Sequence, residues 1–380
     1  MKKTLLAAAL VTGFAGSAMA QNSVTLYGVV GVGLGYQSVK PGVAAPNMST
    51  KSQLGMVAGQ GAGSRWGLRG VEDLGGGLKA NFVLESALNA TTGAMSGFSR
   101  QSTLGLTSDS WGAVDLGRRT APSTAAFSGI DPFGAAYGTS ALTGTIGTNF
   151  NRYSNMVMYS SPSISGFRAF VGYSFDTGLT IDGTPTNTTA VTAYGSGYKS
   201  RATSIGLRYG NGPIVLAATF DNIQAPASRT GVAAANTYRT WALGGTYDLK
   251  VVKLHAAYSQ ATQGILNNAT IVAAALGAGA GDTNTESNLV FIDGARTQSW
   301  MVGASAPVGS GSLFAGVQQQ LPGGNLKTDS TANELVASVG YSYNLSNRTS
   351  LYAFYSYVNN IAMIKDAVSN QVGLGITHSF

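Results

Sequence analysis

The sequence contains no cysteine and few charged residues, and each shortage excludes a class of protein. Without cysteine there can be no disulfides, and thiolate catalysis or Cys-metal chemistry is excluded. Charged residues make up 10% of the chain, whereas soluble proteins carry about 25%. Proline is also sparse, with 10 residues against 52 glycines. A chain so poor in charge is expected to lie in a membrane.

The first residues have the layout of a secretory signal peptide. Lys2 and Lys3 precede a short apolar run, and Ala18-Met-Ala20 forms a small-residue cleavage site. The run is too short to span a bilayer, which needs about 20 helical residues. We expect residues 1–20 to be removed as a signal peptide. The same glycine-rich, charge-poor composition continues to the end, so residues 21–380 are expected to form a single domain.

Beyond this segment, long apolar runs are missing, and apolar residues instead alternate with small or polar ones, as in half-buried strands. The clearest alternating stretches are 24–36, 167–175, 214–220, 335–343, 351–357 and 372–380. A transmembrane β-barrel explains both the low charge and the lack of apolar runs, because successive residues of its strands face lipid and lumen in turn. The predicted fold class is therefore all-β.

The connections between strands alternate in length. Short turns are expected near 72–77, 107–113, 162–166, 210–213, 249–252, 307–311 and 345–349. Long loops are expected near 37–63, 89–98, 119–150, 176–200, 222–237, 261–295, 321–333 and 359–370. Short turns at one end and longer loops at the other are typical of an outer-membrane barrel, here of about sixteen antiparallel strands.

Charged and aromatic residues indicate which face of each strand meets lipid. The ionisable residues that are placed well inside a strand fall on the non-apolar parity: Lys79, Glu85, Arg168, Arg208, Asp221, Asp248, Lys253 and Glu334. A lysine or arginine at mid-depth on the lipid face would cost roughly 2–4 kcal/mol, so these residues should face the lumen. Aromatics of the apolar parity lie near strand ends, as in interfacial girdles. The alternative, a soluble β-sandwich, would bury its aromatics in mid-strand.

Five motifs occur in an order and spacing that resemble one family. They are Ser23-Val-Thr-Leu-Tyr-Gly28, Ser64-Arg-Trp-Gly-Leu-Arg-Gly-Val-Glu-Asp-Leu-Gly75, Leu116-Gly-Arg118, Arg152-Tyr-Ser-Asn155 and His378-Ser-Phe380. The chain resembles the trimeric general diffusion porins of Gram-negative outer membranes, most closely their β-proteobacterial branch. The resemblance covers essentially the whole chain after the signal peptide. It implies a barrel of about sixteen strands whose third loop folds into the pore.

The resemblance also implies a row of basic residues on the barrel wall. By motif, this row contains Arg65 and Arg69 on the second strand, Arg118 at the end of the fifth and Arg152 at the start of the sixth. These side chains have a second reading as structural partners of acidic neighbours, such as Glu85 or Asp115.

Two features of the row stay open. Strict alternation points Arg119, not Arg118, into the lumen, unless Gly117 introduces a bulge that shifts the register. In the family, acidic residues of the third loop face the basic row, and here only Asp131 is available for that role. Met158 stands at an inward position where relatives often carry a basic residue.

Enzyme, metal and nucleotide sites find little support. His255 is expected to be a solvated lumen histidine, since Ser259 on the same face is about 13 Å away along the strand, too far for a nucleophile and its base. His378 should point outward. No cysteine or clustered histidine offers a metal site. The glycines of 31–35 lack the G-x-G-x-x-G spacing, and are expected to thin the inner wall or contact a neighbouring subunit.

We therefore expect an outer-membrane porin without enzymatic activity, cofactor or metal, through which small hydrophilic solutes and ions diffuse passively. A formal net charge of +7, or +5 without Lys2 and Lys3, favours anions. The charges form no basic runs, so nucleic acid is not an expected partner. Two alternatives are a substrate-specific channel for organic acids or phosphate-like anions, and a non-conducting adhesin with loops 37–63 and 261–295 as its binding surfaces. The small residues at inward positions favour an open channel.

Partners follow mainly from the resemblance. It implies a homotrimer surrounded by outer-membrane lipid and lipopolysaccharide. The chain ends on Phe380, preceded at alternate positions by Ile376, Leu374 and Val372. That ending resembles the terminal signal that the barrel-insertion machinery reads. The last strand is also expected to pair with the first, because an open edge in lipid would leave backbone groups unpaired.

Overall fold

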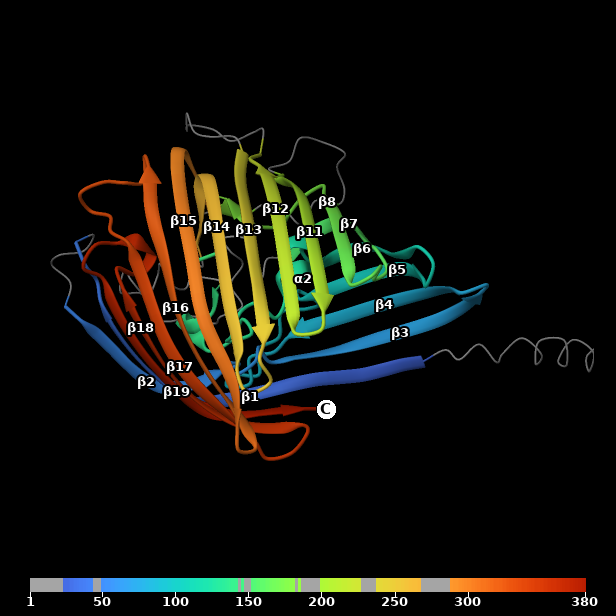
Figure 1. Ribbon diagram of the computed structural model, residues 1–380, viewed down its shortest axis with the longest axis horizontal. Coiled ribbons are helices and arrows are strands. Elements are labelled where there is room, and N and C mark those ends of the chain that lie inside the picture. The colour runs from blue at the N-terminus through green and yellow to red at the C-terminus, as the bar shows by residue number, and fades with distance from the viewer. Residues whose placement is uncertain are drawn as a thin grey trace, which may run out of the picture.

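The computed structural model describes residues 23–43, 49–142, 145–146, 152–181, 184–185, 199–226, 237–267 and 288–380. The expected signal peptide, residues 1–20, lies outside them. Within the described residues, no helix has the length and apolar character needed to cross a bilayer. Nearly all of the regular structure is strand, and the strands form one closed sheet (Figure 1).

The wall strands are β1 (Ser23–Lys40), β2 (Lys51–Ala58), β3 (Arg65–Gly75), β4 (Leu78–Ala87), β5 (Gln101–Ser108), β6 (Gly112–Thr120), β7 (Arg152–Ser160), β8 (Phe167–Ser174), β11 (Arg201–Asn211), β12 (Ile214–Gln224), β13 (Thr237–Asp248), β14 (Lys253–Asn267), β15 (Asn288–Val308), β16 (Gly311–Gly324), β17 (Glu334–Asn344), β18 (Thr349–Asn359) and β19 (Val368–Ser379). The short strands β9 (Thr180–Ile181) and β10 (Thr184–Pro185) lie in a loop. The chain also forms α2 (Pro122–Phe127), η1 (Gly138–Ser140) and η3 (Ile361–Met363).

The barrel has sixteen antiparallel strands, which confirms the predicted fold. Strands β2 and β3 pair with successive lengths of β1 and together count as one strand of the wall. The barrel closes between the first and last strands, from the pair Val29 and Ser379 to the pair Lys40 and Val368. The backbones of Gly28 and Phe380 also exchange two hydrogen bonds of 3.1 Å. The C-terminus accordingly lies beside β1 (Figure 1).

The alternation of the sequence matches the two faces of the wall. Leu104, Leu207 and Leu374 are 63%, 53% and 52% exposed, respectively, and stand outward among other apolar residues. The inward positions between them carry small or polar residues, such as Thr103 and Gly206. In water this outer surface would be a large exposed apolar patch, whereas in a bilayer it is matched by lipid.

Several predicted loops are shorter than expected. The stretch 37–63 was expected to be a loop, yet β1 continues to Lys40 and β2 occupies Lys51–Ala58. Likewise β14 reaches Asn267, β15 begins at Asn288 and β16 extends to Gly324. The loop prediction was wrong here because strand pairing continues beyond the apolar band, where an outward side chain can be polar.

The segment between β2 and β3 turns toward the barrel interior. A Cβ on Gly35 would lie 2.8 Å from the amide nitrogen of Gln60, and one on Gly31 would lie 3.3 Å from the carbonyl oxygen of Ala62. Gln60 is 4% exposed, and its carbonyl accepts a hydrogen bond from the backbone of Tyr137. The glycines of β1 therefore make room on the inner wall for a segment of the same chain.

Candidate pore constriction

Two arginines share the inner face of β3, Arg65 and Arg69, which lie four residues apart. The register pairs Gly67, which lies between them on the same face, with Tyr27 of β1 and Glu85 of β4. The hydroxyl of Tyr27 donates to the Glu85 carboxylate at 2.9 Å, and the guanidinium of Arg69 lies 5.3 Å from the Tyr27 ring centroid. Arg65 Nε lies 3.7 Å from Glu85 Oε2.

Three further arginines reach this position from neighbouring strands. Arg100, directly before β5, donates from Nε to Glu85 Oε1 at 2.7 Å. Arg118 of β6 donates to the Ser99 carbonyl at 2.5 Å and to the Ser154 hydroxyl at 2.8 Å. Arg152, which opens β7, is in electrostatic range of Arg65, Arg100, Arg118 and Glu85. We refer to Arg65, Arg100, Arg118 and Arg152, together with Glu85, as the arginine cluster.

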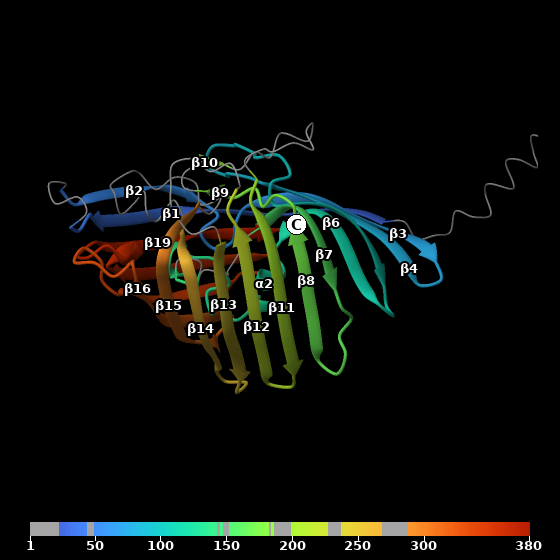
Figure 2. The ribbon, with the colours of Figure 1, turned by 90° about the horizontal axis from the view of Figure 1, so that it is seen from above.

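The third loop, which connects β6 to β7, covers the opposite part of the inner wall. Figures 1 and 2 show α2 inside the ring of strands. Pro122 packs over Gly172 of β8 and Gly206 of β11, and Phe127 over Gly244 of β13. Small residues at these inward positions allow the loop backbone to approach the wall closely.

The same loop continues across the remaining strands. Pro132 lies over Gly303 of β15, and the ring of Tyr137 packs at 4.8 Å from Phe314 of β16 and 5.6 Å from Phe354 of β18. The backbone of Thr139 donates to Gln371 of β19 at 3.0 Å. The third loop thus follows the inner faces of β8 through β19, which we call the packed wall. The arginine cluster occupies β3 to β7.

The comparisons with known proteins agree with this architecture. The family model of the Gram-negative porins matches residues 6–362. The chain belongs to the Gram-negative porin family. It is 43% identical to an outer membrane porin protein of Bordetella pertussis, with 100% of both chains covered. It is 34% identical to outer membrane porin protein 32 of Delftia acidovorans, covering 98% of this chain and 92% of the relative.

A solved structure supports the same assignment. The anion-selective porin from Comamonas acidovorans is 26% identical, with a TM-score of 0.70 over 95% of this chain and 100% of that one. The porin is therefore an outer-membrane channel for the passive diffusion of small hydrophilic solutes. The predicted family, location and general function are confirmed.

The porin sends Arg118 and Arg119 to different partners. Gly117 has φ of +126°, and the pairing of β6 with β7 shifts register between Gly117 and Arg119. Arg119 forms an ion pair with Asp115, whose side chain is buried at an inward position. Arg118 instead donates to the Ser154 hydroxyl and lies in electrostatic range of Arg152. The bulge that alternation alone left open is present, and it sends the two neighbours to different partners.

Asp131 is not brought to the arginines. It is 4% exposed, and its carboxylate accepts hydrogen bonds from the backbone N–H groups of Phe133, Ala135 and Leu142 at 2.8, 3.0 and 3.1 Å. Burial outweighs these bonds and raises the pKa of Asp131 to about 6. The acid expected to oppose the arginine cluster serves to hold the third loop together.

His255 also differs from its expected environment. It was predicted to be solvated in the lumen, yet it is 6% exposed. Its Nδ1 lies 2.9 Å from the carbonyl oxygen of Ile130 and its Nε2 lies 3.0 Å from the Ser305 hydroxyl. With Arg208, which donates to the carbonyl of Ala126 at 2.9 Å, it ties the third loop to the packed wall. The sequence pattern places His255 at an inward position, but it does not show that the third loop covers this position.

Two residues of the site were missed as members of the pore wall. Arg100 lies outside the five motifs that resemble the family, and no strand periodicity precedes it. Tyr27 lies within the first motif, but its contact with Glu85 depends on the pairing of β1 with β3 and of β3 with β4. Arg100 and Tyr27 could have been predicted only from the register between strands, which a single sequence does not contain.

Proposed function

We propose that the porin prefers anions because Arg65 and Arg100 pair with the one carboxylate of Glu85 while Arg118 and Arg152 add positive charge beside them. The described part of the third loop packs on the other strands of the wall, so the excess positive charge of the cluster acts on permeating solute from the opposite side. Fixed charges in a narrow passage with low-dielectric walls concentrate ions of opposite sign. Arg65, Arg118 and Arg152 supply this field together with Arg100, while Arg69 extends the basic surface along β3.

The test is the reversal potential of single channels in a dilute KCl gradient. A unit charge about 4 Å from an ion in water contributes about 1 kcal/mol, or roughly a factor of five. Arg65→Ser and Arg152→Ser should therefore each lower the anion-to-cation permeability ratio several-fold, while conductance is kept or rises. Arg168→Ser is the control, because its side chain packs over Phe170 and donates to the Ser161 carbonyl, away from the cluster.

Salt and pH sharpen the test. Selectivity should fade as salt rises from 0.1 to 1 M, because the Debye length falls from about 10 to about 3 Å. It should stay constant between about pH 5 and 9, because the guanidinium group of arginine remains protonated. Cation preference in the unmodified protein would overturn the proposal. Conductance that saturates at low concentrations of an organic acid would support the substrate-specific alternative.

The remaining proposals concern maturation and assembly. Residues 1–20 are removed as a signal peptide, residues 21–380 form the barrel, and the barrel assembles as a homotrimer. Phe380 contributes to recognition by the insertion machinery; its 46% exposed ring and its backbone pairing with Gly28 also suit ordinary closure of the barrel. N-terminal sequencing of the membrane fraction and native electrophoresis of a Phe380 deletion test these points. Undiminished yield of heat-modifiable trimer would leave Phe380 a closure residue only.

A further inference from the structure

A bulge interrupts the barrel wall between β2 and β3. The pairing of β2 with β1 stops at Ala58, opposite Val32, and the pairing of β3 resumes at Arg65, opposite Val29. The six residues 59–64 thus oppose only the two residues between Val29 and Val32, so this strand carries four more residues than a continuous ladder would hold. Residues in excess of the ladder are left unpaired and bend out of the sheet. We call residues 59–64 the inner bulge.

The inner bulge is fixed to β1 at both of its ends. The backbone N–H of Gly59 donates to the carbonyl of Gly31 at 2.9 Å. The N–H of Gly31 donates to the hydroxyl of Ser64 at 2.9 Å, and this hydroxyl lies 3.1 Å from the Gly31 carbonyl, to which it donates. Ser64 is 2% exposed, and its own carbonyl accepts a hydrogen bond from the backbone of Leu88 at 3.0 Å. Ser64 thus replaces the missing ladder partner of Gly31, so that the buried backbone groups stay paired and the wall stays closed.

Between its two ends the inner bulge lies over the inner faces of β18 and β19. A Cβ on Gly61 would lie 2.6 Å from the ring of Tyr352 on β18 and 2.9 Å from the hydroxyl of Thr377 on β19. Contacts this close leave no space between the bulge and the wall. Gly61, Ala62 and Gly63 are nevertheless partly exposed. The side of the inner bulge that faces away from the wall therefore borders the lumen.

The inner bulge touches both parts of the constriction. The carbonyl of Gln60 accepts a hydrogen bond of 2.6 Å from the backbone N–H of Tyr137 in the third loop. The carbonyl of Gly63 accepts a hydrogen bond of 2.8 Å from Arg65 Nη1, and a Cβ on Gly63 would lie 3.3 Å from Arg100 Nη1. Three residues of extended chain span at most about 11 Å. The inner bulge therefore bridges a short distance between the third loop and the arginine cluster.

We propose that the inner bulge determines the size limit of the pore and positions two of its arginines. It forms a third side of the constriction, between the end of the packed wall at β19 and the arginine cluster. Its six residues carry no ionisable side chain, so it narrows the passage without adding charge. The carbonyl of Gly63 holds Arg65, and the absence of a side chain at Gly63 leaves room for Arg100. The effect on solute size follows from the geometry, whereas the effect on ion selectivity rests on the proposed function of the arginine cluster.

Deletion of residues 60–63 tests the effect on solute size. It leaves Gly59 and Ser64 opposite the two unpaired residues of β1, and because an even number is removed, every later side chain keeps its face of the wall. The shortened ladder should therefore close into a folded, heat-modifiable barrel. Liposome swelling in neutral sugars measures permeation, and the rate for a disaccharide relative to a pentose should rise several-fold. Gln60→Ala is the control, because it keeps the backbone carbonyl that binds Tyr137, and its relative rate should not change.

Gly63→Val tests the effect on the arginines and keeps the inner bulge. The added side chain meets the flexible end of Arg100, so the barrel should fold while Arg100 is displaced from Glu85. The anion-to-cation permeability ratio should fall by roughly twofold in dilute KCl. The disaccharide rate should fall as well, because valine occupies part of the passage. Gly55→Val on β2 is the matched control, since a Cβ there meets nothing within 4 Å, and both readouts should match the unmodified protein.

The sugar and ion measurements separate this proposal from the proposed anion preference. A relative disaccharide rate that is unchanged in the deletion variant and in Gly63→Val would overturn the role of the inner bulge in pore size, whatever the ion selectivity. A permeability ratio that is equal in Gly63→Val and Gly55→Val would overturn the positioning of Arg100. Cation preference in the unmodified porin would contradict the proposed function, but the sugar rates would still test the bulge. If the deletion variant is not heat-modifiable, the sugar rates of Gly63→Val and Gly55→Val decide the question alone.

Discussion

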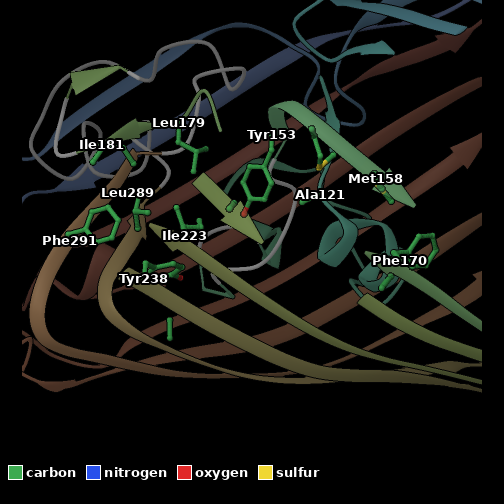
Figure 3. Close-up of a cluster of buried hydrophobic side chains, with 14 residues drawn as sticks. Ala121, Tyr153, Met158, Phe170, Leu179, Ile181, Ile223, Tyr238, Leu289 and Phe291 are labelled. Atoms are coloured by element: carbon green, nitrogen blue, oxygen red, sulfur yellow. The ribbon is translucent and has the colours of Figure 1, made fainter. Parts of the chain in front are cut away.

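The inner surface of this barrel is divided between the arginine cluster on β3 to β7 and the packed wall on β8 to β19. On the packed wall, glycines and alanines accept the third loop, and apolar side chains close the space beside it. Figure 3 shows Ile223, Tyr238, Leu289 and Phe291 gathered near Leu179 and Ile181 of the loop after β8. The side chains of the arginine cluster are instead held by polar contacts, to Glu85, Ser99 and Ser154. The packed wall is lined by apolar contacts, and the arginine cluster by charged and polar ones.

The boundary between the halves falls within two residues of β7. Arg152 contributes to the arginine cluster, whereas Tyr153 is 1% exposed and packs in the apolar cluster, with its hydroxyl 3.5 Å from Asp221. Asn155 has a left-handed φ of 48° close by, opposite the bulge of β6. Irregular backbone on both strands lets neighbouring side chains serve different halves, which strict alternation would forbid.

The largest expected effect comes from removing the acid that organises the third loop. Asp131→Ala leaves three buried N–H groups without an acceptor, at a cost of about 1–3 kcal/mol each. The loop should lose its fixed position on the packed wall, and single-channel recordings should show larger and noisier conductance. Asp131→Asn, which keeps acceptor oxygen, is the milder control. Unchanged recordings for Asp131→Ala would show that the loop is held mainly by its apolar contacts.

A smaller effect is expected from pH. The pKa of Asp131 is raised by burial to about 6, above an unfolded value of about 3.9. The folded loop thus binds the proton more tightly, so the associated stability is present below about pH 4 and is lost as pH rises through 6. The stability of the folded loop should fall by on the order of 3 kcal/mol at most over this window. The fluctuations of the loop, seen as conductance noise, should increase accordingly. Asp131→Asn should abolish this dependence, whereas its persistence would assign it to another group, such as His255.

A bulky side chain added to the packed wall should lower the conductance. The effect should be similar to or smaller than that of pH. A Cβ on Gly244 would lie 2.6 Å from Phe127 and 2.9 Å from Ile130. Gly244→Leu should therefore displace the third loop toward the arginine cluster, at about 1–3 kcal/mol, and lower the conductance. Gly210→Leu is the matched control, since a Cβ there meets nothing within 4 Å. Equal conductance for both variants would mean that the loop does not limit the pore.

The smallest effect concerns the single acid of the arginine cluster. Glu85→Gln keeps the shape of the side chain and removes its charge, so the anion-to-cation permeability ratio should rise, by roughly twofold in dilute salt. Reversal potentials measure the change. A fall in the ratio would mean that Glu85 acts chiefly by positioning Arg65 and Arg100, which would then leave the pore wall.

The sequence by itself determined the barrel, its sixteen strands and the inward direction of most charges. These follow from a period of two residues and from the cost of placing charge in lipid, both of which are local properties. The motifs also identified Arg65, Arg118 and Arg152. Only the tertiary structure decided which inward residues face water, because the third loop covers those of β8 to β19. In the folded barrel His255 is buried, and the Asp131 carboxylate binds backbone groups of its own loop. Arg100 and Tyr27 meet at Glu85, because contacts between distant strands depend on register and loop packing.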